Sequence, residues 1–292
     1  MRFISFVAAG RTGTAIRLGS EIRGLTASDV DFPGTLDALL AGGAEAMQSA
    51  HDVLAKAKPI DPTAIEYRPP LHRPGKILCI GLNYREHSAE SGHAQPTYPA
   101  IFARFPSSLI GHEQPLVRPL ASNTLDFEGE LAVIVGGRGR RIPLADALNY
   151  VAGYSVFNDG SIREFQHKTG QWTVGKNFDG TGAFGPEFIT ANELPPGADG
   201  LKIETRLNGA TVQSANTREM VFNVASLIAI LSEAITLEPG DVIVSGTPSG
   251  VGHARTPKLY MKNGDVSEVE IEGVGRLRNV VADERNEAVF AA

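Results

Sequence analysis

Two glutamates separated by a single glycine lead directly into a continuous apolar run. This arrangement constrains the fold more than any other feature of the sequence. Glu128 and Glu130 precede Leu131–Val135, a run suited to a buried strand. Side chains alternate along a strand, so both carboxylates face the same side. Water could solvate such a pair on an exposed strand, but a buried strand can hold it only if a cation or strong donors neutralise the charge. The sequence therefore predicts a buried strand that begins at a charged site.

A third carboxylate stands at the end of another apolar run. Asp159 follows Val151–Phe157 and precedes Gly160. Three carboxylates near strand ends form an oxygen-rich site for a hard divalent cation, and Mg²⁺ or Mn²⁺ would suit it. Spacing along the chain does not by itself place Asp159 beside the two glutamates.

Short strands with brief helices between them make up most of the chain. Apolar alternation or apolar runs predict strands at 2–7, 14–18, 76–81, 128–136, 151–159, 201–213, 241–245 and 266–281. Helical spacing predicts helices at 35–57, broken at Gly42-Gly43, at 84–91 and at 223–235, the last being the main helix. Asn208-Gly209 favours a type I′ hairpin turn. Interleaving without regular βαβ units indicates a mixed, largely antiparallel, β-rich α+β fold.

Prolines concentrate between residues 59 and 74, which favours a linker there. We therefore expect a small N-terminal β-containing domain with its linker at residues 1–73 and a catalytic domain at residues 74–292. The first part contains no cluster of chemically useful side chains, so the site is expected in the second.

A histidine and a glutamate three residues apart form the next candidate pair. His87 and Glu90 share one face of a helical turn, where a carboxylate can orient an imidazole and raise its basicity. This is the arrangement of a general base with its orienting group. The alternative is structural, because Asn83 and Glu86 fit a capping box and His87 with Glu90 could be a surface pair.

A loop rich in small residues and a lysine complete the candidates. Ser245–Gly252 follows a predicted strand, and its small residues would let the backbone approach a ligand closely. Thr247 offers a hydroxyl and an amide to a carboxylate, whereas a phosphate loop is disfavoured because the Walker lysine is missing. Lys176 lies among apolar and small residues and could bind an anion or balance the carboxylates, although a single lysine is more often a surface residue.

Charge and composition exclude several classes of function. The 33 acidic and 27 basic side chains give a net charge of −6, which argues against nucleic acid as a partner. Cys79 is the only cysteine and lies in an apolar run, as expected for a buried thiol in a reducing compartment. No stretch approaches the length of a membrane span, and we expect a cytoplasmic protein without a membrane partner.

Taken together, these motifs resemble the fumarylacetoacetate hydrolase family over roughly residues 74–282. The resemblance is carried by five stretches in the family's order, namely Ile80–Tyr84 with His87 and Glu90, Asp126–Val133, Gly153–Asp159, Trp172–Phe178 and Ser245–Gly252. Each stretch alone is short, but their joint order and setting are specific.

The resemblance implies a metal site and a proton-transfer pair. It implies that Glu128, Glu130 and Asp159 bind Mg²⁺ or Mn²⁺. It also implies that His87 and Glu90 activate water or relay protons from a short helix that orders over the substrate.

Further residues are implied around the substrate. Lys176 and Thr247, with Gly246 of the same loop, are expected at the substrate's carboxylate and oxo groups. Gln166 matches a position where members commonly place a polar substrate contact. The family fold is a β-rich roll that usually dimerises, so the resemblance implies a homodimer.

The reaction implied is metal-assisted chemistry on a small 2-oxo acid held through its carboxylate and 2-oxo oxygens. We expect hydrolysis of a C–C bond in an acylpyruvate such as fumarylpyruvate or maleylpyruvate, in catabolism, because His87 with Glu90 suits water activation. The alternative is an oxaloacetate-type decarboxylase or a 2-oxo diacid isomerase on the same site, and a second is a non-catalytic member that binds metal or ligand. We also expect Ser88–Pro99 to close over bound substrate.

Overall fold

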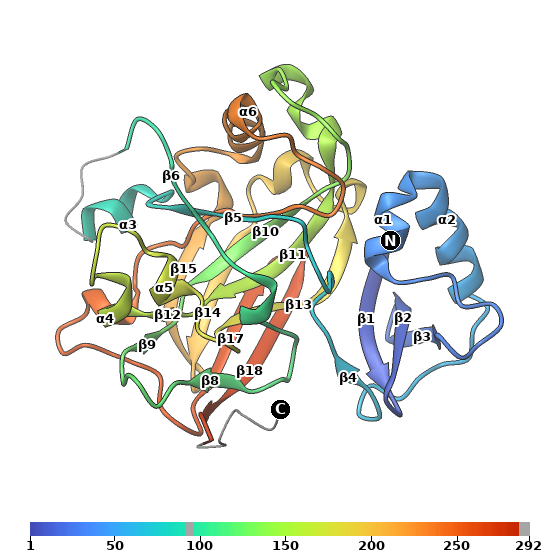
Figure 1. Cartoon of the computed structure of the whole chain (residues 1–292), viewed down its shortest axis with the longest axis horizontal. Helices are drawn as coiled ribbons and strands as arrows, with labels where there is room; N and C mark the ends of the chain where they lie inside the picture. Colours follow the sequence, from blue (N-terminus) through green and yellow to red (C-terminus); the bar gives the residue numbers. More distant parts are fainter. Residues whose placement is uncertain (91–95, 286–292) are drawn as a thin grey trace, which may run out of the picture.

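The computed structural model describes residues 1–90 and 96–285, and within them eleven strands form one large sheet (Figure 1). Its main path runs β3-β2-β1-β13-β11-β10-β16-β5-β6, while β4 pairs with β1 and β7 with β13. The strands are β1 (Arg2–Ala8), β2 (Arg11–Leu18), β3 (Glu21–Thr26), β4 (Glu66–Tyr67), β5 (Ile77–Gly81), β6 (Ala100–Ala103), β7 (Leu109–Ile110), β10 (Gly129–Val135), β11 (Val151–Asp159), β13 (Gly182–Thr190) and β16 (Val242–Val244). The predicted β-rich α+β fold is confirmed.

Two smaller sheets complete the β structure. The first runs β15-β14-β17-β18-β8 and contains β8 (Leu116–Arg118), β14 (Lys202–Leu207), β15 (Ala210–Asn216), β17 (Val266–Ile271) and β18 (Gly275–Asp283). The second pairs β9 (Leu125–Asp126) with β12 (Ser161–Ile162). Asn208 and Gly209 join β14 to β15 with positive φ angles of 52° and 80°, as a type I′ turn requires. The predicted hairpin is therefore confirmed.

Helices are short and lie outside the sheets. They are α1 (Leu36–Ala41), α2 (Gly43–Leu54), α3 (Arg85–Glu90), α4 (Arg163–Gln166), α5 (Thr173–Lys176) and α6 (Val224–Ala234). The 3₁₀ turns are η1 (Pro106–Ser108), η2 (Leu144–Tyr150), η3 (Ala191–Glu193), η4 (Pro196–Ala198), η5 (Thr217–Glu219) and η6 (Gly252–Ala254). Within the described residues, no helix has the length and apolar character needed to cross a membrane.

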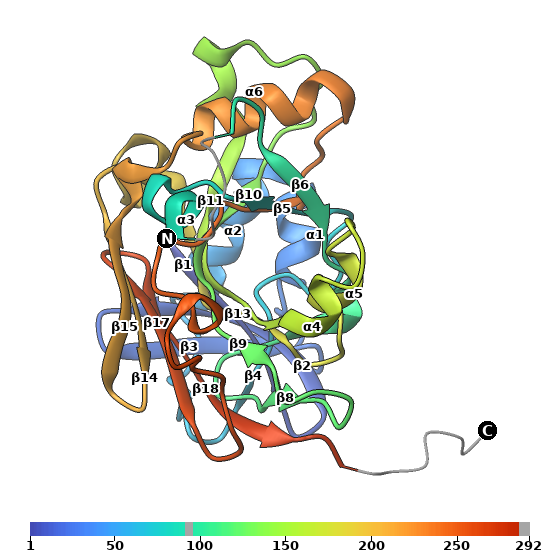
Figure 2. The same cartoon turned by 90° about the vertical axis from the view of Figure 1, so that its left-hand side faces the viewer.

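The helix expected at residues 223–235 is present as α6, although α2 with 12 residues is longer than α6 with 11. Asn223 caps α6, since its side chain accepts a hydrogen bond from Ser226 N. The buried face of the helix belongs to the same apolar core as Leu131 and Val133 of β10. Figure 2 shows α6 beyond the ends of β5, β10 and β11. This packing supports β10, the strand that starts between the two glutamates.

The N-terminal part is joined to the rest of the chain through the large sheet. In β1, Arg2 pairs with Ile189 and Phe3 with Phe188 of β13. Helices α1 and α2 lie beside β1, β2 and β3 on one side of a larger body (Figure 1). The domain boundary near residue 73 stays a prediction.

The ends of four neighbouring strands of the large sheet lie together, and this strand-end side of the sheet is called its edge below. The antiparallel pairing of β10 with β11 and with β16 brings the start of β10 to the ends of both partners. Strand β5 runs parallel to β16, so it ends at the same edge. Helix α3 and the loop after β16 continue from there. The expected lid at Ser88–Pro99 lies partly outside the described residues, because it includes 91–95.

Candidate active site and metal centre

Three buried carboxylates meet where β10 starts and β11 ends. Glu128 precedes β10, Glu130 is its second residue, and Asp159 is the last residue of β11. Asp159 N donates to Glu128 O at 2.8 Å, which locks the two strand ends together. Each of the three residues offers a carboxylate oxygen, and these oxygens lie within 4.8 Å of one another. The structure thus brings together all three predicted metal ligands.

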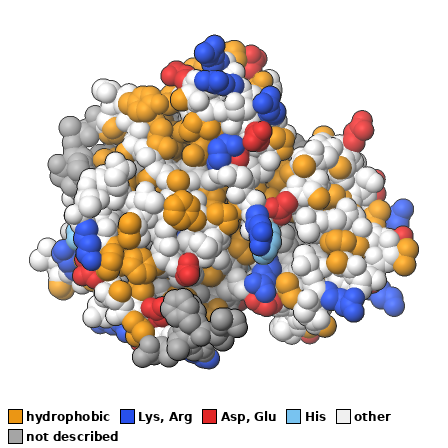
Figure 3. All heavy atoms as spheres, in the orientation of Figure 1, with side chains coloured by type: hydrophobic (Ala, Val, Ile, Leu, Met, Phe, Trp, Pro, Cys, Tyr) orange, Lys and Arg blue, Asp and Glu red, His pale blue; other side chains and the backbone are white. Residues whose placement is uncertain are grey.

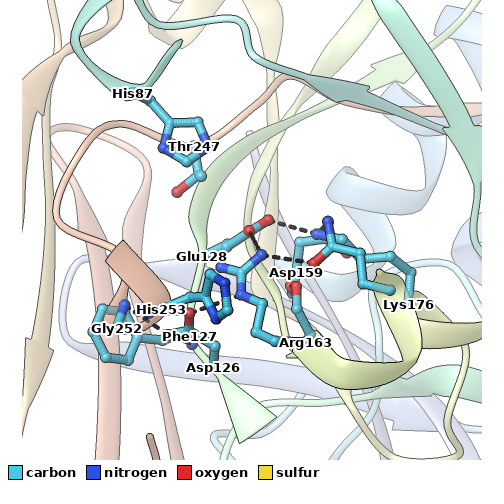
Figure 4. Close-up of polar contacts among 12 residues, drawn as sticks. His87, Asp126, Phe127, Glu128, Asp159, Arg163, Lys176, Thr247, Gly252 and His253 are labelled. Atoms are coloured by element: carbon cyan, nitrogen blue, oxygen red, sulfur yellow. Dashed lines mark hydrogen bonds and ion pairs between the residues drawn. The ribbon is translucent and has the colours of Figure 1, made fainter. Parts of the chain in front are cut away.

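Buried cations neutralise part of this charge. Lys176 Nζ lies 2.6 Å from Glu128 Oε2 and 2.5 Å from Asp159 Oδ2. Arg163 Nη1 lies 2.6 Å from Glu128 Oε1, and Arg104 Nη1 lies 2.5 Å from Asp159 Oδ1. In Figure 4, Arg163 and Lys176 approach Glu128 on the side away from His87. Burial raises the pKa of Glu128, but Arg163 and Lys176 outweigh it and hold that pKa at about 2.

Among the described residues, no cationic side chain forms an ion pair with Glu130. It accepts a short hydrogen bond from Gly246 N. Burial, together with the charges of Asp159 and Glu128, raises the pKa of Glu130 well above its ordinary value. A carboxyl group in this condition needs either a proton or a further positive charge.

A divalent cation fits this site on chemical grounds. All three candidate ligands are carboxylate oxygens, the donors that Mg²⁺ and Mn²⁺ prefer. With Asp126 included, four buried carboxylates face the three cations Arg104, Arg163 and Lys176. The missing positive charge is at Glu130, and a metal ion bound there would supply it.

His87 and Glu90 lie on α3, above the carboxylates. His87 Nδ1 lies 3.5 Å from Glu90 Oε2, so Nε2 is the ring nitrogen left for proton transfer. Both oxygens of Glu90 also accept from Gly250 N at 3.0 Å. Burial raises the pKa of Glu90, but the His87 and Gly250 contacts lower it below its ordinary value. Glu90 is therefore held as a carboxylate that faces an imidazole.

The capping-box alternative does not describe Asn83. Its side-chain oxygen accepts from Phe222 N at 2.8 Å, and its amide donates to Ser245 O at 2.7 Å. Glu86 accepts instead from Ser249 Oγ at 3.3 Å. Asn83 thus ties the end of β5 to the loop after β16 and to the start of α6, and so holds the base of α3 in place.

A cavity of about 230 Å³ opens beside the carboxylates. The predicted site residues His87, Glu90, Glu128, Glu130, Gln166, Lys176 and Thr247 all line it. Phe102 and Trp172 form an aromatic wall, with their ring centroids 5.5 Å apart. The volume suits a small acid, and the wall gives its carbon chain an apolar surface.

The loop residues have partners within the protein. The amide of Gly246 donates to Glu130, so its direct partner is a candidate metal ligand. Thr247 Oγ1 donates to Gly129 O at 3.0 Å and accepts from Gln213 Nε2 at 2.9 Å. The roles of Gly246 and Thr247 in substrate binding stay predictions.

Three charged residues at the site were not predicted from the sequence. Arg104 and Arg163 pair with the carboxylates as described, and Asp126 accepts from Arg163 Nε at 2.8 Å. Arg163 also donates to Gln166 Oε1 at 2.9 Å, which orients the predicted substrate contact. The three-residue spacing of Arg163 and Gln166 on α4 was the signal that could have identified the arginine.

The sequence is similar to those of known proteins along almost its whole length. Residues 76–282 match the family described as "Fumarylacetoacetate (FAA) hydrolase C-terminal". The chain is 38% identical over 287 residues to an oxaloacetate tautomerase, Fahd2a, of Rattus norvegicus mitochondria, covering 96% of this chain and 91% of that protein.

Two solved structures share the fold over almost the whole chain. A fumarylacetoacetate hydrolase from Exiguobacterium antarcticum is 35% identical with a TM-score of 0.86, covering 97% of this chain and 100% of that one. A maleylpyruvate hydrolase from Sphingobium sp. SYK-6, in complex with manganese(II) and pyruvate, is 26% identical with a TM-score of 0.80, covering 98% and 100%. The chain belongs to the fumarylacetoacetate hydrolase family.

Proposed function

We propose that the chain is a Mg²⁺- or Mn²⁺-dependent enzyme of small 2-oxo diacids, and that it interconverts the keto and enol forms of oxaloacetate. The observation that carries this proposal is the His87–Glu90 pair in the lining of a 230 Å³ cavity. Glu128 and Glu130 line the same cavity, and Asp159 lies directly behind them in the carboxylate cluster. Tautomerisation needs one base beside an activated 2-oxo group, and this arrangement provides it. The 38% identity to an oxaloacetate tautomerase over nearly the full length supports this choice of reaction.

Each group has a defined task in this proposal. Glu128, Glu130 and Asp159 would hold the ion, which would supply a Lewis acid that polarises the 2-oxo group. His87 takes a proton from the carbon next to that group, and Glu90 stabilises the imidazolium that results. The His87 imidazolium then gives this proton to the 2-oxo oxygen, while the C–H electron pair forms the C=C bond and the C=O double bond becomes the C–O bond of the enol. No C–C bond breaks. Lys176 keeps positive charge within the cluster throughout.

C–C hydrolysis of an acylpyruvate is the second candidate. One observation favours it, namely that a maleylpyruvate hydrolase solved with manganese(II) and pyruvate shares the fold at 26% identity. In that reaction His87 would deprotonate a water molecule instead of substrate carbon, on the same wall of the cavity.

A single product analysis separates the candidates. Mn²⁺-loaded protein is mixed with enol-rich oxaloacetate, and the loss of enol absorbance is followed beside carbon NMR of the products. We expect faster equilibration with an intact four-carbon skeleton, and a loss of about 10²–10⁴-fold in His87→Ala. Release of CO₂ would identify a decarboxylase instead. Pyruvate formed from fumarylpyruvate, with no effect on oxaloacetate, would identify a hydrolase, and equilibration no faster than with free Mn²⁺ would overturn the proposal.

A further inference from the structure

The part of the cavity lined by α4 and η6, here called its outer end, is rich in hydrogen-bond donors. His167 follows α4, His253 lies in η6, and both line the cavity together with Arg163. The rings of His167 and His253 are stacked, with centroids 5.3 Å apart and an interplanar angle of 32°. Figure 3 shows histidine and basic side chains gathered at the edge of the molecule where α4 lies in Figure 1.

The backbone under His253 is fixed by a buried carboxylate. Gly252 N donates to Asp126 Oδ1 and His253 N donates to Asp126 Oδ2, both at 2.8 Å. Asp126 is fully buried and also accepts from Arg163 Nε at 2.8 Å. Figure 4 shows His253 and Arg163 beside this carboxylate. One aspartate therefore sets the positions of two groups at the outer end of the cavity.

The proton of the His253 ring is placed by its neighbours. His253 Nδ1 lies 2.8 Å from Tyr260 Oη and 3.4 Å from Lys258 Nζ. An ammonium group can only donate, so the Lys258 contact favours an Nδ1 without hydrogen, which then also accepts from the Tyr260 hydroxyl. Nε2 of the neutral ring must then carry the hydrogen and act as a donor.

Arg163 adds a second donor at this end. Its side chain is 6% exposed and its Nε and Nη1 are occupied, yet Nη2 has no hydrogen-bond partner among the described residues. A buried guanidinium nitrogen without an acceptor is costly, and an anion in the cavity would relieve that cost. The two acidic partners of this guanidinium contact its other nitrogens, Asp126 at Nε and Glu128 at Nη1.

We propose that His253, seated on Asp126 and stacked on His167, is a specificity determinant that receives the distal carboxylate of a 2-oxo diacid. The inference rests on the proposed function in one respect, since it assumes that the 1-carboxylate and 2-oxo group lie at the Glu128, Glu130 and Asp159 end. The remaining carbon chain then runs toward η6 and α4, where an imidazole N–H and the Lys258 ammonium favour a second carboxylate over a methyl group.

The test measures binding without depending on turnover. Trp172 is the only tryptophan in the chain and lines the cavity, so its fluorescence reports ligands directly. Mn²⁺-loaded protein is titrated with oxaloacetate, with 2-oxobutanoate, which has the same carbon chain but no distal carboxylate, and with oxalate, which fills only the metal end. His253→Ala and His253→Gln are compared with His72→Ala, an exposed histidine that does not line the cavity.

We expect the unmodified protein and His72→Ala to bind oxaloacetate more tightly than 2-oxobutanoate. His253→Ala should weaken oxaloacetate binding by about 10-fold or more while leaving 2-oxobutanoate and oxalate within about 2-fold, because a hydrogen bond to a charged group is lost. His253→Gln should recover part of the difference, since it restores an N–H donor. Oxalate binding confirms that each variant is folded.

The outcomes separate this inference from the proposed reaction. If oxaloacetate is preferred and the preference depends on His253 while no isomerisation occurs, the reaction proposal fails and the subsite stands. Equal losses for both 2-oxo acids in His253→Ala, or no preference for oxaloacetate in the unmodified protein, would overturn the subsite whatever the reaction is.

Discussion

Lys176 Nζ lies 2.5 Å from Asp159 Oδ2, within the group of carboxylates that would hold the metal ion. Burial lowers the pKa of Lys176, but Asp159 and Glu128 outweigh it and raise that pKa, so the amine stays charged. Asp159 is therefore tied to permanent cations whether or not a metal ion is bound, whereas Glu130 is not. The two carboxylates should respond differently to substitution.

Glu130→Gln should abolish tight Mn²⁺ binding and leave the metal-free fold intact, because a neutral side chain of the same size replaces a carboxyl group whose pKa is already raised. Asp159→Ala should also abolish binding, but it removes the carboxylate partner of Arg104 and one of the two carboxylate partners of Lys176. Breaking a buried ion pair from one side costs about 3–5 kcal/mol, so the metal-free variant should unfold earlier in urea. Calorimetry with Mn²⁺ and urea titrations on both variants test this contrast, and equal stability of the two would contradict it.

Metal affinity should rise with pH because of Glu130. The pKa of this group is raised by burial and by its acidic neighbours, so below that raised pKa the metal-free protein carries a proton there. A metal ion must displace this proton, and affinity therefore increases as pH rises, by up to about tenfold per unit, until the raised pKa is passed. Mn²⁺ titrations in two buffers of different ionisation enthalpy measure the proton released. An unmodified protein that binds Mn²⁺ without proton release at any pH would refute the idea.

The histidine pair should affect turnover and not chelation. His87→Ala is expected to leave Mn²⁺ and oxalate affinity nearly intact while turnover falls by about 10²–10⁴-fold, as when a positioned base is lost. Glu90→Gln should lose less, because the imidazole remains and only its orientation and basicity change. Oxalate calorimetry and turnover are measured on the same preparations. A His87→Ala variant with full activity would show that the pair has no catalytic part.

Asp126→Asn should raise KM more than it lowers kcat. The amide cannot accept from both Gly252 N and His253 N and also neutralise Arg163, so the outer end of the cavity loses its support. Asp126 has no place among the candidate metal ligands, so Mn²⁺ affinity should stay within a few-fold. Kinetics with oxaloacetate and Mn²⁺ calorimetry provide the two readouts. A loss confined to kcat would indicate a different role for this aspartate.

The sequence predicted the carboxylates better than the cations. Alternation along one strand was sufficient to place Glu128 and Glu130 on one side, because it depends only on local geometry. The approach of Asp159 depends on the pairing of β10 with β11, which no local pattern contains. Arg104 follows the edge strand β6 but reaches Asp159 and Thr181, 55 and 77 positions away. Burial of such a side chain is a tertiary property.

For the fold as well, the local elements were predictable and the long-range contacts were not. Turn chemistry at Asn208-Gly209 and the apolar runs identified the strands, since both act over a few residues. Asn83 is an example. The local sequence around it fits a capping box, but in the folded chain its side chain forms hydrogen bonds with Phe222 and Ser245. These long-range hydrogen bonds take the place of the capping-box bond that the local sequence predicts.

The pairing of β1 with β13 has a consequence for association between molecules. Strand β13 is buried along its whole length, with β11 on one side and β1 and β7 on the other. Detachment of β1 would expose part of β13 as an unprotected edge, the kind of surface that recruits strands from other molecules. The first strand of the chain therefore covers an edge that could otherwise support intermolecular sheet growth, and destabilising β1 is expected to increase aggregation.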